Sequence, residues 1–206
     1  MAARIEEQPA PPQLVYGAGE MPRYVALLRG INVGGRNKVA MADLRRVTAS
    51  LGHTEVATYI QSGNVFFTSP DTSIISVADA LEQEIARSLA VQPAVVVLSR
   101  AGLAQVIADN PFPQVTNPKC LHAVFRRQEM TPDAIAAIAA AQRSARANGS
   151  RDEAIVVGRT LFLHTPDGLG RSELARQLAR SSGQAAGTAR NWTTVTRLMA
   201  MLEPAA

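Results

Sequence analysis

The segment from Arg29 to Lys38, which we call the Gly-rich loop, carries the side chains best suited to binding an anion. It combines three cations and two asparagines with three glycines. Glycine allows consecutive backbone N–H groups to point into one concavity, and nearby Arg or Lys side chains add positive charge. A tight turn that merely needs glycine is the alternative interpretation. The candidate ligand-binding residues of the loop are Arg29, Gly30, Asn32, Gly34, Gly35, Arg36, Asn37 and Lys38.

Two known phosphate-binding motifs do not fit this loop. Gly30, Gly35 and Arg36 imitate the spacing of a phosphate loop, but Asn37 stands where a Ser or Thr would hold magnesium. The G-x-G-x-x-G pattern of a dinucleotide-binding turn is absent. The loop therefore predicts an anion site of another kind.

Two further polar stretches could contribute to such a site. The first has residues typical of a hairpin turn, and turn chemistry alone is the alternative explanation of its side chains. The second, near the C-terminal end of the chain, has two interpretations. It is either a helix cap beside a buried indole, or a lid in which an Arg pairs with an anion and a Trp stacks on a ring. The candidate residues are Gln61, Ser62, Gly63 and Asn64 in the first stretch, the hairpin tip, and Arg190, Asn191 and Trp192 in the second.

No set of catalytic or metal-binding side chains is evident. His53, His122 and His164 have no Ser or Cys nucleophile placed beside them by the sequence, and most such histidines are structural. The single Cys120 cannot form an internal disulfide, and no Cys/His cluster has the spacing of zinc ligands. Asp152 borders a predicted loop and is expected to be solvated. We therefore predict no metal and no cofactor, and the catalytic residues stay unassigned.

The spacing of apolar residues predicts an α+β fold in two halves. The first half has the order βαββαβ, which is the ferredoxin-like arrangement, and the second repeats it as βαββα before a C-terminal helix that Asn191 caps. The predicted strands are 24–28, 56–60, 65–68, 94–98, 121–125, 155–157 and 161–164, and the predicted helices are 44–51, 74–89, 99–108, 132–148, 172–179 and 192–202.

These elements divide the chain into three parts. Residues 1–22 hold four prolines and no apolar period, which predicts a flexible tail. A ferredoxin-like domain is predicted at 23–99 and a second α+β domain at 100–206. Met21 directly precedes the first strand, so translation of the native protein is hypothesised to begin there, which its intact mass tests.

The predicted topology brings two of the polar stretches together. In a ferredoxin-like sheet the first and second strands run parallel with the third between them. The Gly-rich loop and the hairpin tip then leave the same end of the sheet. This arrangement predicts that the polar side chains of the two stretches lie within reach of one another. They are Arg29, Asn32, Arg36, Asn37 and Lys38 in the loop and Gln61, Ser62 and Asn64 in the hairpin tip.

Three stretches resemble the signature stretches of the bacterial family named domain of unknown function 1697. They are Ala-Leu-Leu-Arg-Gly-Ile-Asn-Val-Gly-Gly at 26–35 with Asn-Lys-Val at 37–39, Tyr-Ile-Gln-Ser-Gly-Asn-Val at 59–65, and Thr188, Arg190-Asn191-Trp192 and Thr194-Val195. The resemblance spans about residues 21–203. It departs from the usual pattern at Arg36, Ala40 and Glu173, where Lys, Pro and a basic residue are usual. The resemblance implies a ferredoxin-like first domain and implies no reaction.

Composition and charge limit the remaining choices. With 47% hydrophobic and 18% charged residues, the 206-residue chain has the composition of a globular protein. No apolar run approaches the roughly twenty residues that span a bilayer, so we expect a cytoplasmic protein without a membrane partner. Residues 100–206 carry 13 Lys/Arg against 8 Asp/Glu. These cations, among them Arg126 and Arg127, are spread over several predicted elements, which favours solvated helix faces.

Three functional hypotheses follow. The leading one is a binding module for a nucleotide-like or phosphorylated anion at the end of the first domain that carries the Gly-rich loop and the hairpin tip. The alternatives are a small metal-independent metabolic enzyme and a structural or partner-binding protein without a ligand, which a fully hydrogen-bonded loop cluster would favour. Nucleic acid is a less favoured partner, because the strands 24–28 and 94–98 are apolar on both faces and predict a covered sheet.

Overall fold

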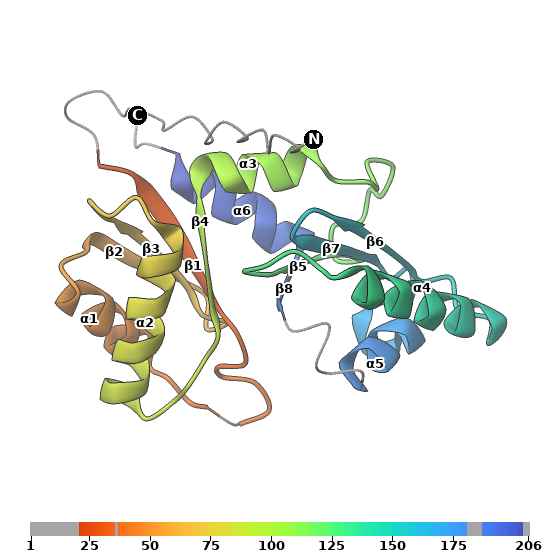
Figure 1. The fold of residues 1–206 in the computed structure, drawn as a ribbon, viewed down its shortest axis with the longest axis horizontal. Helices are drawn as coiled ribbons and strands as arrows, with labels where there is room; N and C mark the ends of the chain where they lie inside the picture. Colours follow the sequence, from red (N-terminus) through yellow and green to blue (C-terminus); the bar gives the residue numbers. More distant parts are fainter. Residues whose placement is uncertain (1–20, 36, 181–186, 204–206) are drawn as a thin grey trace, which may run out of the picture.

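The computed structural model describes residues 21–35, 37–180 and 187–203, and it confirms two successive α+β repeats (Figure 1). The predicted tail, apart from Met21 and Pro22, lies outside the described residues. The strands are β1 (Arg23–Leu28), β2 (Thr54–Tyr59), β3 (Asn64–Thr68), β4 (Val95–Ser99), β5 (Leu121–Phe125), β6 (Glu153–Val157), β7 (Thr160–His164) and β8 (Thr188–Asn191). The helices are α1 (Met41–Ser50), α2 (Ile74–Leu89), α3 (Arg100–Ala108), α4 (Pro132–Ala147), α5 (Glu173–Arg180) and α6 (Trp192–Leu202), with a 3-10 turn η1 (Leu169–Arg171) before α5.

The first sheet has the strand order β2-β3-β1-β4. Both neighbours of β1 run antiparallel to it, so that Leu27 pairs with Asn64 of β3 and with Val96 of β4. Because β2 is also antiparallel to β3, the segment after β1 and the tip between β2 and β3 leave the same end of the sheet. This end carries both predicted loops, and we call it the loop end.

The second sheet repeats this order as β6-β7-β5-β8, which confirms the duplicated plan. The sequence prediction was incomplete, because it ended the second repeat at α5 and missed β8. This strand holds only Thr-Ala-Arg-Asn and passes directly into α6, so it shows no apolar alternation. It pairs with β5, where Ala123 lies opposite Arg190.

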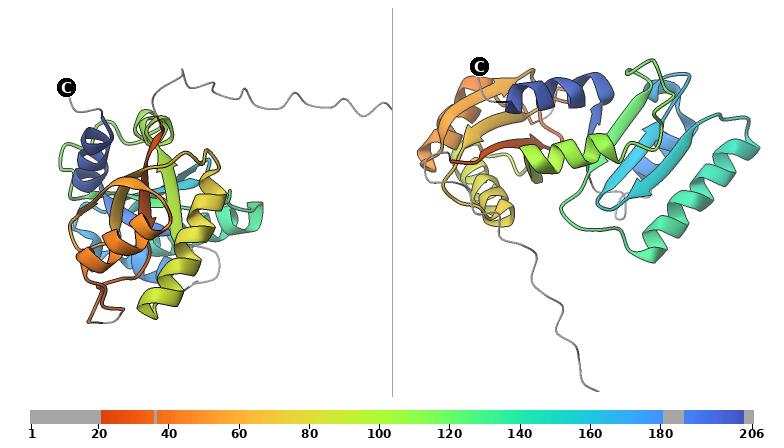
Figure 2. Two further views of the ribbon diagram at one scale, coloured as in Figure 1. Left: turned by 90° about the vertical axis from the view of Figure 1, so that its left-hand side faces the viewer. Right: turned by 90° about the horizontal axis from the view of Figure 1, so that it is seen from above.

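Helices cover the outer face of each sheet, and α3 and α6 lie between the two sheets (Figures 1 and 2). The helices α1 and α2 pack on the first sheet, and α4 and α5 pack on the second. Side chains from both sheets and from α3 and α6 form one further cluster, which we call the central core. Its buried members are Val25, Leu27, Phe66, Val96, Leu103, Phe112, Leu121, Ala123, Phe125, Phe162, Val195, Leu198 and Leu202.

The central core covers the inner face of the first sheet. Phe66 is fully buried in it, and the neighbouring Phe67 is fully buried on the other face, under α1 and α2. The expected coverage of both faces is therefore confirmed. Neither aromatic ring of β3 is available for stacking on a nucleic-acid base.

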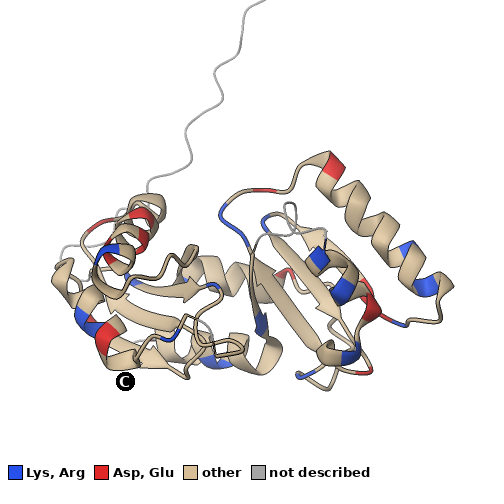
Figure 3. Cartoon of the chain, turned by 90° about the horizontal axis from the view of Figure 1, so that it is seen from below, with Lys and Arg blue, Asp and Glu red and all other residues tan. Residues whose placement is uncertain are grey.

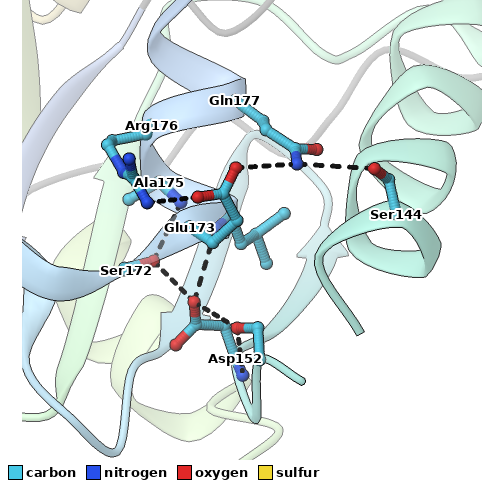
Figure 4. A network of polar contacts seen from close by, with 9 residues as sticks. Ser144, Asp152, Ser172, Glu173, Ala175, Arg176 and Gln177 are labelled. Carbon is cyan, nitrogen blue, oxygen red and sulfur yellow. Dashed lines mark hydrogen bonds and ion pairs between the residues drawn. The ribbon is translucent and has the colours of Figure 1, made fainter. Parts of the chain in front are cut away.

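Asp152 is buried, which contradicts the expectation that it is solvated. The residue is only 4% exposed, and its carboxylate accepts hydrogen bonds from Ser150 Oγ (2.7 Å) and Ser172 Oγ (2.8 Å). Ser172 Oγ in turn accepts the N–H of Ala175 in the first turn of α5 (2.8 Å; Figure 4). The carboxylate therefore joins the start of β6 to the start of α5, where a helix leaves N–H groups unpaired.

His122 on β5 predicts a loss of stability in acid. Burial lowers the pKa of its imidazole below the ordinary value of 6.5. The unfolded chain therefore binds more protons than the folded protein below pH 6.5, and the free energy of unfolding is expected to fall as the pH decreases from 6.5 through the lowered pKa. Urea unfolding between about pH 7.5 and 5 should show a weaker decline for His122→Leu than for the wild type. The remaining decline is expected from His53, whose pKa is also lowered by burial. Parallel profiles for the two proteins would contradict this assignment.

Candidate functional site

The asparagines of the Gly-rich loop hold the loop in place. Asn32 Oδ1 accepts the N–H of Val39 (2.8 Å), and Asn32 Nδ2 donates to the carbonyl oxygens of Val39 (2.9 Å) and Gln61 (3.0 Å). Asn37 Nδ2 donates to the carbonyl oxygen of Gly30 (3.0 Å). The contact between Asn32 and Gln61 confirms that the loop and the hairpin tip meet. Both asparagine side chains fix the loop through backbone groups of the chain itself.

The hairpin tip packs tightly against the end of β1. The carbonyl oxygen of Gly63 accepts the N–H of Leu28 (2.8 Å). Gly63 has a φ of +76°, and a Cβ placed there would lie 2.8 Å from both Leu28 Cβ and Ile31 Cδ1. The position therefore requires glycine. The next residue, Asn64, is fully buried, and its Nδ2 donates to the carbonyl oxygen of Tyr59 (3.0 Å).

Arg190 crosses from the second repeat to the loop end of the first. Its Nε donates to Asn64 Oδ1 (2.6 Å), and its Nη2 donates to the carbonyl oxygens of Ser62 (2.9 Å), Gly63 (3.1 Å) and Leu28 (3.1 Å). The residue is 7% exposed, and burial lowers the pKa of its guanidinium to about 10, so it remains protonated near neutral pH. The guanidinium thus binds the hairpin tip, and we call this arrangement the Arg190 clamp.

The two residues after Arg190 serve the helix and the core. Asn191 Oδ1 accepts the N–H of Thr194 (2.8 Å), which confirms Asn191 as the cap of α6. The indole of Trp192 packs against the central core, with its ring centroid 6.2 Å from that of Phe162. This position agrees with a helix cap beside an indole that packs against the core, and the lid stays a prediction.

The remaining predicted residues of the Gly-rich loop stand open to solvent. Gly34, Gly35 and Lys38 are exposed, and Gln61 of the hairpin tip is exposed as well. Arg36 lies outside the described residues. Arg29 differs from these residues, because it also lines a cavity.

A cleft of about 470 Å³ lies at the loop end, between the two repeats. One wall comes from α2 and from the ends of β1 and β4, and the other comes from residues that follow β5 or begin β8. Its volume is within the range of small-molecule sites, which often occur between domains. The lining residues are Arg29, Ile75, Asp79, Ala94, Val96, Arg126, Arg127, Gln128, Gly187 and Thr188.

Equivalent positions of the two repeats meet at this cleft. Arg29 directly follows β1 and Arg126 directly follows β5, the first strand of each repeat. Ala94 directly precedes β4 and Gly187 directly precedes β8, the last strand of each repeat. A Cβ at Gly187 would lie 2.7 Å from the carbonyl oxygen of Phe125, so only glycine allows this approach. The duplicated fold therefore brings two arginines to one place.

The charges in the cleft favour an anion. Burial lowers the pKa of Arg126, and the positive charge of Arg29 lowers it further. Arg127 forms ion pairs with Asp79 and with Glu82 (3.1 Å for Glu82) of α2. Within the described residues, no carboxylate forms an ion pair with Arg29. An anion bound beside Arg29 and Arg126 would relieve their mutual repulsion.

Arg126 and Arg127 were not among the site residues predicted from the sequence. Both were grouped with cations of solvated helix faces, whereas they follow β5 and line the cleft. Figure 3 shows why charge alone gives no signal, because Lys and Arg occur on both halves among acidic residues. The usable signal was the repeat itself, since aligning the first strand of each half places Arg126 opposite Arg29.

The described residues hold neither a metal-binding cluster nor a membrane-spanning helix. No three His, Cys, Asp or Glu side chains there are grouped so that they could hold a metal ion. In the same residues, no helix has both the length and the apolar character needed to cross a membrane.

Comparisons with known proteins agree with the fold and the sequence motifs. The sequence model of a family described as "Protein of unknown function (DUF1697)" matches residues 21–162. A solved structure described as the conserved bacterial protein SP0830 from Streptococcus pneumoniae is similar with a TM-score of 0.68 and 26% sequence identity, over 89% of this chain and 99% of that one. No curated protein matches. Because the family model covers most of the chain, including the Gly-rich loop and the hairpin tip, this protein belongs to the DUF1697 family of proteins of unknown function.

Proposed function

We propose that the protein binds a small anionic molecule, either phosphorylated or nucleotide-like, in the cleft at its loop end. The observation that carries this proposal is the meeting of Arg29 and Arg126 from equivalent positions of the two repeats. Arginine suits such a site, because its planar guanidinium donates two parallel hydrogen bonds to phosphate or carboxylate oxygens. The cytoplasm, as the sequence predicts, is the proposed compartment.

Residues of the predicted polar stretches hold the backbone that carries this site. Asn32, Asn64 and Arg190 hold the loop and the hairpin tip together through hydrogen bonds within the chain. The backbone N–H of Arg29 donates to the carbonyl oxygen of Ala94 (2.9 Å), which fixes the end of β1 beside the start of β4. These contacts hold the base of the Arg29 side chain at the edge of the cleft.

A structural protein without a ligand is the second candidate. The dense hydrogen bonding of the Gly-rich loop and the hairpin tip favours it, because side chains already bonded to the chain have fewer groups left for a ligand. The two candidates differ in what Arg29 and Arg126 do. Only the first gives them a partner outside the protein.

Thermal unfolding in the presence of anions separates the two candidates. A ligand present at about 100 times its Kd adds roughly 2.7 kcal/mol to the free energy of unfolding, which raises the Tm by about 5–10 °C in a protein of this size. We expect such a rise with an organic phosphate or nucleotide from a panel, and a loss of at least about tenfold in affinity for Arg29→Ala and for Arg126→Ala.

Arg46→Ala is the matched control. Arg46 is an exposed cation on α1, so its replacement removes the same charge away from the cleft. An equal loss of affinity in Arg46→Ala would assign the effect to net charge and would overturn the proposed site. A Tm that no anion raises would favour the structural candidate.

A further inference from the structure

A second cavity of about 210 Å³ adjoins the cationic cleft. The two cavities share Ile75, Val96, Arg126 and Arg127 as lining residues. The second cavity continues from these residues between α2 and the Gly158–Arg159 turn that joins β6 to β7. We call the two cavities together the extended groove.

Aliphatic side chains dominate the middle of this groove. Ile75, Leu98, Val106 and Val157 line it from four different elements. Ile75 lines both cavities and is 61% exposed. A ligand that covers this apolar side chain removes it from water, which favours binding. Phe125, the one aromatic residue among the described residues that line the second cavity, is buried in the central core. The groove therefore offers apolar contact and no exposed ring for stacking.

The carboxylates that line the groove already have partners. Asp79 pairs with Arg127, and Asp109 Oδ1 accepts a hydrogen bond from Gln105 Nε2 (2.8 Å). Arg159 also lines the second cavity, where its Nη1 donates to the carbonyl oxygen of Arg127 (3.4 Å). The groove thus combines guanidinium groups with a strip of aliphatic side chains, and no described carboxylate in it lacks a cationic or amide partner.

We propose that the ligand is an alkyl phosphate, in which Arg29 and Arg126 bind the phosphate and the aliphatic body lies along Ile75, Leu98 and Val157. This inference rests on the proposed function and narrows it. A phosphate suits two guanidiniums that line one cleft, since it carries up to two negative charges and accepts bidentate hydrogen bonds. A nucleotide fits less well, because a base is bound by stacking or by polar groups along its edge, and the middle of the groove offers aliphatic contacts.

A chain-length series tests the proposal by isothermal titration calorimetry. The probes are inorganic phosphate, methyl, butyl, hexyl and octyl phosphate below their micelle concentrations, and adenosine monophosphate. Each methylene that enters the groove is expected to raise the affinity by about fourfold. Ile75→Ser should reduce this increase per methylene, whereas Arg29→Ala should lower the affinity for every alkyl phosphate and keep the increase. Ile135→Ser, which changes an exposed isoleucine on α4, should behave as the wild type.

Each outcome has a separate meaning. Binding of all phosphates with no dependence on chain length would overturn the inference and leave the proposed function standing. Adenosine monophosphate binding more tightly than hexyl phosphate would also overturn the inference, in favour of a nucleotide site. Absence of binding by every probe would contradict both. An equal loss of chain-length dependence in Ile75→Ser and Ile135→Ser would place the alkyl chain outside the groove.

Discussion

Replacing Arg190 with methionine is expected to lower the free energy of unfolding by about 3–5 kcal/mol. Methionine fills much of the same volume as arginine. The decrease in the free energy of unfolding therefore comes mainly from the lost polar contacts and only to a small extent from a cavity. Without the guanidinium, Asn64 Oδ1 loses its charged donor in a fully buried place, and the carbonyl oxygen of the partly buried Ser62 loses one as well. Burying a polar group without a partner is costly, which makes this the largest effect expected of a single substitution at the loop end.

Urea unfolding followed by circular dichroism measures this loss as a lower midpoint. Arg190→Lys keeps the positive charge but not the fork of donors, and it should recover only part of the stability. Arg197→Met, on the exposed side of α6, is the matched control and should stay within about 0.5 kcal/mol of the wild type. A loss below about 1 kcal/mol for Arg190→Met would show that the Arg190 clamp does not stabilise the folded protein.

The first half of the chain, produced alone as residues 21–99, is expected not to unfold cooperatively. The proposed domain boundary after residue 99 would expose the inner face of its sheet, where Val25, Leu27, Phe66 and Val96 belong to the central core. Each such side chain contributes about 1.5–3 kcal/mol when buried, so the loss is about 6–12 kcal/mol. A whole domain is stable by only about 5–15 kcal/mol, so the fragment should fall below the threshold for folding.

Near-ultraviolet circular dichroism and binding of a hydrophobic dye measure this outcome. We expect residues 21–99 to lose the near-ultraviolet signal and bind the dye, and residues 21–203 to show one cooperative transition under the same conditions. Addition of a fragment that spans residues 100–203 should restore part of the signal, because it supplies α3 and α6. A sharp urea transition of the first fragment alone would instead show that the two halves are independent domains.

Local sequence signals were sufficient to predict most of the fold. The apolar runs that predicted the helix at 132–148 and the strands at 155–157 and 161–164 each lie within one short stretch, and the structure has a helix and a strand hairpin at these places. β8 could not be found in this way, because its strand character comes from pairing with β5, and its own residues carry no apolar period. Tertiary pairing overrides local preference in such a segment.

The site was only partly predictable for a related reason. The meeting of Asn32 with Gln61 followed from the topology of one sheet, which the sequence indicated. The meeting of Arg29 with Arg126 depends on how the two repeats pack, and no pattern within either repeat reports that packing. Asn37 and Arg190, which the sequence predicted as ligand-binding residues, also bond to backbone groups of the chain, and residue type alone does not report such contacts.

The Arg190 clamp also sets the order in which the molecule can be completed during synthesis. Its contacts to Asn64 and Leu28 span 126 and 162 positions of the sequence. At roughly 5–20 residues per second, a ribosome needs about 6–25 seconds to extend the chain from Asn64 to Arg190. During that interval the end of β1 and the hairpin tip lack their clamp, and the first sheet lacks α6. Contacts of such long range close slowly and late, so the first half depends on the last residues of its own chain to reach its final state.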